Sequence, residues 1–380
     1  MTLPTPIKRT MLAGMVSMAV SQTATAAVTE EEFQALQEQL NLLADQVERN
    51  STGSNDATTI GGYGELHYNN WTYDSGEKFR EIDLHRFVLF FNHEFNDSIR
   101  LFTELEIEHA LAGEGKNGEV EVEQAYVQFD LNDNTQLNGG VFLIPVGILN
   151  ETHEPPTFYG VERNPIEKNI IPATWWEGGA MFSGQYESGL SYDLAVHSGL
   201  NVESDPAESK FANIRSGRQK TSNAVADNLA ATARLKYTGM PGLTLSGTVQ
   251  YQDDISQTAN DGIDSATLFE AHARYTVADI TLTGLIAQWD IDGTAVAAAG
   301  KDKQDGAYLE ASYRINPQWG VFVRQNQWDN GGTGDTGIDQ TDVGFNYWPH
   351  EDVVVKADYV AQDNNSDDFD GFNLGIGYQF

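Results

Sequence analysis

Cysteine is absent from the 380-residue sequence, and basic residues are few, with 22 Lys and Arg against 56 Asp and Glu. The lack of cysteine excludes disulfides, thiolate metal sites and a cysteine nucleophile. The formal net charge of −34 argues against a nucleic-acid partner, because phosphate binding depends on clustered Lys and Arg. No run approaches the roughly 18 uninterrupted apolar residues of a membrane-spanning helix. The HExxH, GxSxG and P-loop motifs are also missing, so no enzyme class or cofactor is indicated.

The first 26 residues have the pattern of a secretory signal peptide. Lys8 and Arg9 precede the apolar segment Met11–Val20, and Ala24-Thr25-Ala26 follows as a small-x-small cleavage site. The sequence therefore predicts cleavage after Ala26 and export from the cytoplasm.

Residues 27–50 are predicted to form a heptad helix. Apolar residues recur at alternating spacings of three and four, which is typical of a coiled-coil seam: Phe33, Leu36, Leu40, Leu43 and Val47. Thr29 and Glu32 form a capping box at the start. Three interpretations remain open: a coiled coil projecting from an oligomer, a single amphipathic helix that lies on or plugs the main domain, and an anchor to peptidoglycan or a periplasmic partner. Residues 51–58 are polar and are expected to form a linker.

From residue 59 onward the hydrophobic period becomes two. In one segment Leu229, Ala231, Ala233, Leu235 and Tyr237 alternate with Ala230, Thr232, Arg234 and Lys236. Such alternation indicates strands with one face on an apolar medium and the other on water.

The connections between these strands alternate in length. Short turns such as Asn96-Asp97 and Ala278-Asp279 are interleaved with long polar loops such as 201–227. Short periplasmic turns and long external loops are the plan of an outer-membrane barrel, and the segments number about 16. We therefore predict an all-β, 16-stranded antiparallel transmembrane barrel over residues 59–380. A soluble β-sandwich or propeller is the alternative, but it would expose Tyr, Phe and Leu on every strand.

Aromatic residues near the strand ends are expected to lie in the two interfacial girdles of such a barrel. They are Trp71, Tyr73, Trp175, Trp176, Tyr237, Tyr251, Trp289, Trp319, Trp328 and Trp348.

Residues 144–179, IPVGILNETHEPPTFYGVERNPIEKNIIPATWWEGG, carry a more specific signal. This segment resembles the region around the third external loop of bacterial porins of the phosphate-selective porin O/P family. The resemblance implies a homotrimer and a constriction loop, near 146–173, that folds into the pore. Members of that family line the pore with Arg and Lys ladders, whereas here Glu151, Glu154, Glu162 and Glu167 accompany Arg163 and Lys168.

The candidate pore residues follow from this placement. The expected constriction combines six loop residues with six arginines of the barrel wall: His153, Glu154, Tyr159, Glu162, Arg163, Lys168, Arg86, Arg100, Arg234, Arg274, Arg314 and Arg324. Opposed basic and acidic walls would orient dipolar solutes. Alternatively, these charges pair with each other and hold the loop against the wall.

The sequence thus favours an outer-membrane porin that passes small hydrophilic solutes or ions by passive diffusion, without a cofactor. A selective phosphate or anion porin of the same fold is one alternative, although the acidic excess favours cations. An outer-membrane barrel enzyme is the alternative from another class. The expected partners are outer-membrane lipids, lipopolysaccharide and further copies of the chain.

Overall fold

The computed structural model describes residues 57–113, 115–259, 261–364 and 367–380. The predicted signal peptide (1–26), heptad helix (27–50) and most of the linker (51–58) lie outside the described residues. Residues 57–380 form one compact unit.

The described residues form 16 antiparallel strands closed into a barrel, in which β1 pairs with both β2 and β16. Every other pairing joins neighbours in the sequence. The strands are β1 (Thr58–Tyr73), β2 (Lys78–Asn96), β3 (Ile99–Gly113), β4 (Lys116–Asn132), β5 (Thr135–Leu143), β6 (Trp176–Gln185), β7 (Leu190–His197), β8 (Ala230–Met240), β9 (Leu243–Gln252), β10 (Ala266–Val277), β11 (Ile280–Ile291), β12 (Lys303–Asn316), β13 (Trp319–Asp329), β14 (Ile338–His350), β15 (Val353–Asp363) and β16 (Phe369–Gln379).

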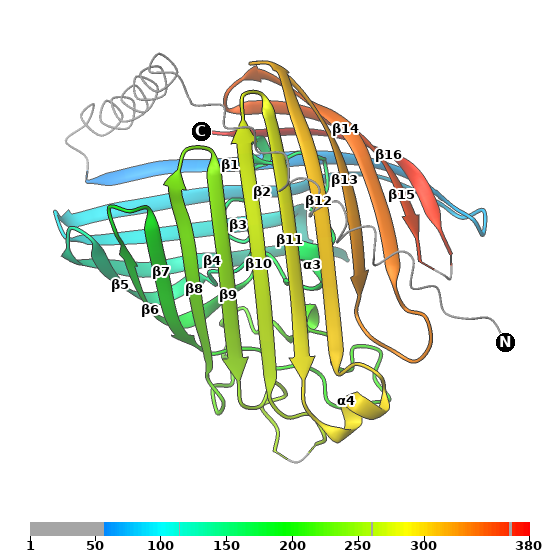
Figure 1. Ribbon diagram of the computed structural model, residues 1–380, viewed down its shortest axis with the longest axis horizontal. Helices are drawn as coiled ribbons and strands as arrows, with labels where there is room; N and C mark the ends of the chain where they lie inside the picture. Colours follow the sequence, from blue (N-terminus) through cyan, green and yellow to red (C-terminus); the bar gives the residue numbers. More distant parts are fainter. Residues whose placement is uncertain (1–56, 114, 260, 365–366) are drawn as a thin grey trace. The chain divides into compact units, whose positions relative to one another are not determined.

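Short turns occupy one end of the barrel, and the other end carries the long connections together with the short β1–β2 and β3–β4 connections (Figure 1). The long connections carry four short helices: η1 (Pro155–Thr157), α3 (Ile166–Asn169), η2 (Arg215–Gly217) and α4 (Thr294–Ala298). Among the described residues, no helix is long and apolar enough to cross a membrane.

Burial along the strands is the reverse of that in a soluble protein. On β9, Leu245 and Val249 are each 43% exposed, whereas Thr248 and Gln250 are buried. The same alternation holds on β8, where Leu235 points outward and Arg234 is buried. The outer face is therefore apolar and the lumen face polar, as hydrocarbon outside and water inside require.

One sector of the lumen face departs from this rule. Leu268 on β10, Leu285 and Trp289 on β11 and Trp328 on β13 point inward and are buried. They are covered by apolar residues of the β5–β6 connection, including Ile166 and Ile170. The hydrophobic core of this protein therefore lies inside the barrel, between wall and loop.

This packing corrects part of the predicted aromatic girdle. Five of the ten residues are almost fully buried, because they contact loops inside the barrel and not the lipid boundary: Trp175, Trp176, Trp289, Trp328 and Trp348. Trp319 and Tyr251 remain on the exposed outer face.

Candidate functional site at the lumen constriction

The connection between β5 and β6, residues 144–175, is called L3 here, and it folds into the lumen. Its η1 turn packs against β1, β15 and β16. On the same side, the Phe158 carbonyl accepts a hydrogen bond of 3.0 Å from Asn346 Nδ2, and the Val161 amide donates to Asp358 Oδ2 at 2.6 Å. L3 therefore runs from β5 across the interior to the opposite wall.

Charged contacts hold L3 at both sides of the barrel. Nε2 of His153 lies 3.4 Å from Glu104 Oε1 on β3, and Glu151 pairs with Arg234 on β8. Glu162 accepts hydrogen bonds from Asn69 at 3.0 Å and contacts His67 Nδ1 at 3.1 Å, both on β1. Burial would raise the pKa of Glu162, but the hydrogen bond and positive charge of His67 outweigh it and hold that pKa well below its ordinary value.

Glu167 on α3 organises the interior of L3. Its Oε1 accepts from the amides of Ile148 and Leu149 at 2.5 and 2.6 Å, and its Oε2 accepts from Asn164 Nδ2 and the Tyr308 hydroxyl. Burial raises the pKa of Glu167, although these donors partly offset the shift. One carboxylate thus ties both halves of L3 to β12.

Apolar packing supplies the second anchor. Ile166, Ile170 and Trp175 of L3 pack on Leu268 and Trp289 of the wall, and all five are fully buried. Trp289 Nε1 also donates to the Ile170 carbonyl at 2.9 Å. This apolar anchor was not predicted, because inward positions of a barrel are normally polar.

Basic side chains gather where L3 meets the β7–β8 connection. Arg163 donates to Thr174 Oγ1 at 2.7 Å, Arg215 donates to the carbonyls of Lys168 and Ala173, and Arg218 donates to the Thr174 carbonyl. Lys168 itself is exposed. We call Arg163, Lys168, Arg215 and Arg218 the basic cluster. Across the described residues, no carboxylate oxygen lies within 4.0 Å of any of the four.

An acidic row on β3 and β4, called the glutamate ladder, faces this cluster. It comprises Glu104, Glu106, Glu108, Glu119, Glu121 and Glu123. Ligand atoms of Glu106, Glu121 and Glu123 lie within 4.8 Å of one another, as do those of Glu108, Glu119 and Glu121. Burial lowers the pKa of Arg218 more than the carboxylates of Glu121 and Glu123 raise it.

The six glutamates of the ladder, and likewise Arg215 and Arg218, are not among the candidate pore residues chosen from the sequence. The ladder has a readable signal, because E-L-E-I-E and E-V-E-V-E place glutamate at every second position of two adjacent strands. Arg215 and Arg218 have none, since they come from an irregular loop.

Three wall arginines of the predicted set are paired and buried. Arg86 contacts Glu65 at 2.9 Å and Glu106 at 3.2 Å. Arg324 contacts Glu310 at 3.1 Å and Asp342 at 3.2 Å and donates to the Tyr159 carbonyl, while the Tyr159 ring meets Trp348 edge-on. Arg234 holds both Glu151 and Asp193.

The remaining predicted residues are not part of these buried ion pairs, although Arg100 lines one cavity together with Arg234. Arg100 pairs with Asp130 at 2.6 Å beside the β2–β3 turn, where it lines a cavity of about 590 Å³. Arg314 lies 3.6 Å from the ring centre of Trp348 near the β12–β13 turn, and Arg274 is exposed on β10. Glu154 is half-exposed and immediately precedes η1.

Comparison with known proteins agrees with this architecture. The family model described as "Phosphate-selective porin O and P" matches residues 63–370. A protein of Aquifex aeolicus (strain VF5), described as uncharacterized, is 31% identical over 353 residues, which cover 85% of this chain and 80% of that protein. The solved structure of an anion-selective porin from Comamonas acidovorans is similar, with a TM-score of 0.63 and 12% identity over 86% of this chain and all of that one. OmpT of Vibrio cholerae, solved in a trimer form, has a TM-score of 0.55 and 13% identity over the same shares.

The closed barrel, the polar lumen and the inserted loop point to a channel rather than an enzyme, and they place the protein in the bacterial outer membrane. The chain belongs to the phosphate-selective porin O and P family, and it is an outer-membrane porin whose water-filled channel passes small hydrophilic solutes or ions by passive diffusion.

Proposed function

We propose that the constriction of this channel prefers small oxyanions of the phosphate class, which the basic cluster attracts. The observation that carries this proposal is that none of the four cations contacts a carboxylate among the described residues. None of these charges is therefore taken up in a direct ion pair, and they act in a lumen where low-dielectric walls strengthen the field. A guanidinium also presents a planar fork of donors that fits two oxygens of one anion.

The acidic excess of the whole chain favours cations, but much of it is remote from this point or already paired. Glu151 and Asp193 are held by Arg234, Glu310 and Asp342 by Arg324, and Glu119 and Glu121 by Lys220. Since selectivity depends on the field at the narrowest part, the basic cluster outweighs the loop charge. The description of the family and that of the Comamonas relative support this choice.

The glutamate ladder gives the constriction a transverse field, with its negative side on β3 and β4 and its positive side at the basic cluster. In this proposal Arg163 and Lys168 act on the solute. His153, Tyr159, Glu162, Arg86, Arg234 and Arg324 fix the position of L3, and Arg100, Arg274, Arg314 and Glu154 line wider parts of the channel.

Reversal potentials in planar bilayers under a KCl gradient test the proposal. We expect chloride to be preferred over potassium, and added phosphate to reduce the chloride current. Arg215→Gln with Arg218→Gln should shift the reversal potential toward potassium and weaken the block by phosphate about tenfold. Arg80→Gln removes an exposed arginine on the outer face, hydrogen-bonded to Asn70, and should change neither quantity. A potassium preference that the double substitution leaves unchanged would overturn the proposal.

We further propose that the protein is exported by residues 1–26, assembles as a homotrimer and uses residues 27–50 as a coiled coil. The trimer form of the Vibrio relative and the heptad spacing support this assembly. Outer-membrane lipid and lipopolysaccharide then surround the apolar face. Mass spectrometry should find Ala27 at the mature N-terminus, and cross-linking should give trimers that deletion of 28–50 weakens without loss of conductance. Monomers in the full chain would contradict this assembly.

A further inference from the structure

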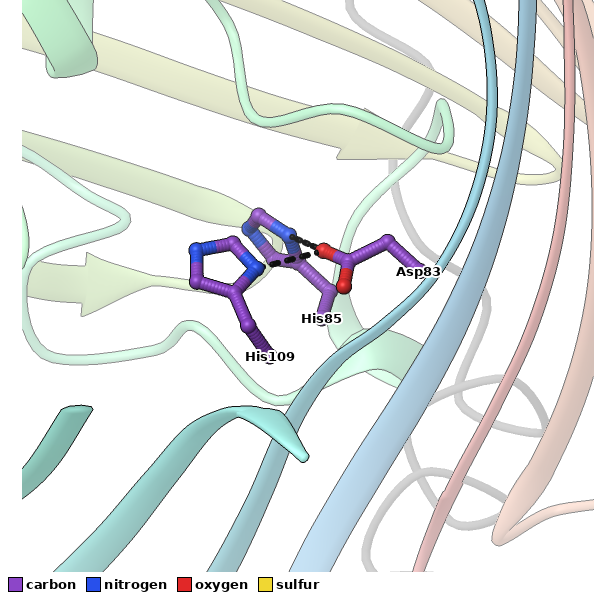
Figure 2. Close-up of side chains that lie close together, drawn as sticks. All are labelled: Asp83, His85 and His109. Atoms are coloured by element: carbon purple, nitrogen blue, oxygen red, sulfur yellow. Dashed lines mark hydrogen bonds and ion pairs between the residues drawn. The ribbon is translucent and has the colours of Figure 1, made fainter. Parts of the chain in front are cut away.

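Three side chains on the lumen face of β2 and β3 converge on one point outside the basic cluster. Oδ2 of Asp83 lies 3.0 Å from His85 Nδ1 and 2.8 Å from His109 Nδ1, so both rings point at one carboxylate (Figure 2). One ligand atom from each residue lies within 4.8 Å of the others. We call Asp83, His85 and His109 the histidine triad.

Two irregularities of the backbone create this convergence. His85 is skipped in the β1–β2 register, which passes from Glu65 opposite Arg86 to Leu66 opposite Leu84, and the extra residue of a bulge is turned out of the regular alternation. His109 has φ 56° and the next residue, Ala110, φ 58°, where the β3–β4 register also breaks. A left-handed conformation is strained for a residue with a side chain, and such strain collects at functional sites.

The triad is joined to the constriction through a second layer of contacts. The His85 ring stacks on His67 at 4.6 Å with an interplanar angle of 13°. His67 in turn contacts two carboxylates, each at 3.1 Å: that of Glu65 on β1 and that of Glu162 in L3. The triad therefore faces the lumen and not the lipid.

The triad is also accessible from the lumen. The side chain of His109 is 42% exposed, that of His85 is 25% exposed, and that of Asp83 is 14% exposed. An ion can thus enter from the channel and keep a position for water, as binding at such a site requires.

We propose that Asp83, His85 and His109 bind a divalent transition-metal ion, of which Zn²⁺ is the best match. Two imidazole nitrogens and one carboxylate oxygen, with a fourth position for water, form a common zinc ligand set. Ca²⁺ and Mg²⁺ prefer oxygen ligands and are disfavoured here. At bond lengths near 2.1 Å, tetrahedral ligand atoms lie about 3.4 Å apart, so the two distances from Asp83 Oδ2 to the imidazole nitrogens, 3.0 and 2.8 Å, must each open by about half an ångström. Each ring then holds its proton on Nε2, while Nδ1 binds the metal.

Calorimetric titration of the full-length protein, folded in detergent and freed of metal with a chelator, tests this site. We expect one Zn²⁺ per chain and no comparable binding of Mg²⁺. His109→Asn removes a ligand but keeps a residue that tolerates left-handed backbone, and Asp83→Asn removes the carboxylate charge. Either change should weaken binding by tenfold or more. The matched control is His93→Ala. His93 lies on β2, as Asp83 and His85 do, but near the other end of the barrel, so this variant should bind Zn²⁺ as the parent does.

Equal binding by the parent and both triad variants, or no binding by the parent below about 100 μM Zn²⁺, would overturn the proposal. A second measurement uses the current: Zn²⁺ should reduce the conductance of the parent and of His93→Ala, but not that of His109→Asn. Because the titration measures no ion flow, failure of the metal site and failure of the proposed anion selectivity give separate results.

Discussion

His67 on β1 lies 3.1 Å from Glu162 of L3, and the two residues are 95 positions apart in the chain. Through this contact, a strand at the start of the barrel fixes a loop that enters from its opposite side. The contact depends on the charge of Glu162, whose pKa lies well below its ordinary value near 4.3.

The Glu162 contact predicts a pH dependence with a definite sign. A carboxyl group whose pKa is lower in the folded than in the unfolded state stabilises the fold above its unfolded pKa. This stabilisation is lost as the pH falls toward the folded pKa. Glu162→Gln should therefore cost on the order of 1 kcal/mol at pH 7, and the difference from the parent should shrink below about pH 4. Urea unfolding of both proteins, followed by heat-modifiable gel mobility from pH 3 to 7, measures this. A difference independent of pH would contradict the ionic role.

The ion pairs of Arg234 predict that removing the cation lowers the free energy of unfolding more than removing one of its carboxylate partners. It neutralises both Glu151, which is one-third exposed, and the more buried Asp193. Glu151→Gln should cost on the order of 1 kcal/mol, whereas Arg234→Gln should cost about 3 kcal/mol, because it leaves Asp193 buried without a cation. The same unfolding measurement decides between them. Equal losses would mean that Asp193 finds another partner.

Gly147 is predicted to be irreplaceable in L3. Its φ is 69°, and a Cβ at this position would lie 2.6 Å from Glu167 Oε1 and 3.1 Å from Ile171. Gly147→Ala should therefore displace the carboxylate that holds L3 together, at a cost of about 1 to 3 kcal/mol. We expect noisier single-channel currents from a loosened loop. Gly139→Ala, where a Cβ meets no atom within 4 Å, is the control and should leave the noise unchanged.

The apolar anchor predicts a contrast between two tryptophans. Trp289 is fully buried under L3, whereas Trp319 is 39% exposed on the outer face. Trp289→Ala should destabilise the protein by about 3 to 5 kcal/mol, since it opens a cavity and removes the hydrogen bond to Ile170. Trp319→Ala should cost much less. Thermal unfolding in detergent compares the two, and similar losses would mean that the anchor contributes little.

The barrel could be predicted from the sequence because two simple rules govern it. Side chains alternate with period two, so Leu235 and Arg234 were assigned to opposite faces, and turn lengths alternate between the two ends of the barrel. The inward apolar sector could not be predicted, because Trp289 faces the lumen only to meet Ile170, 119 residues away. That contact depends on how L3 folds, which no local pattern encodes.

The histidine triad shows the same limit at smaller scale. Regular alternation would have placed His85 and Arg86 on opposite faces, but the bulge at His85 brings both toward the lumen. The left-handed backbone at His109 and Ala110 likewise cannot be read from the sequence, since neither of these two residues is a glycine. By contrast, glutamate recurs at every second position within each of the two ladder segments, 104–108 and 119–123, and this period can be read directly from the sequence.

The seam that closes the barrel has a consequence for biogenesis. β1 and β16 pair in register, with Tyr63 opposite Gln379, although these two residues are 316 positions apart in the chain. Such distant partners meet late, because long segments of chain must be ordered before the pair can form. Until then the nascent sheet has two unpaired edges and an apolar outer face, a combination prone to aggregation. Transport to the membrane therefore requires a chaperone that covers those edges until β1 and β16 pair.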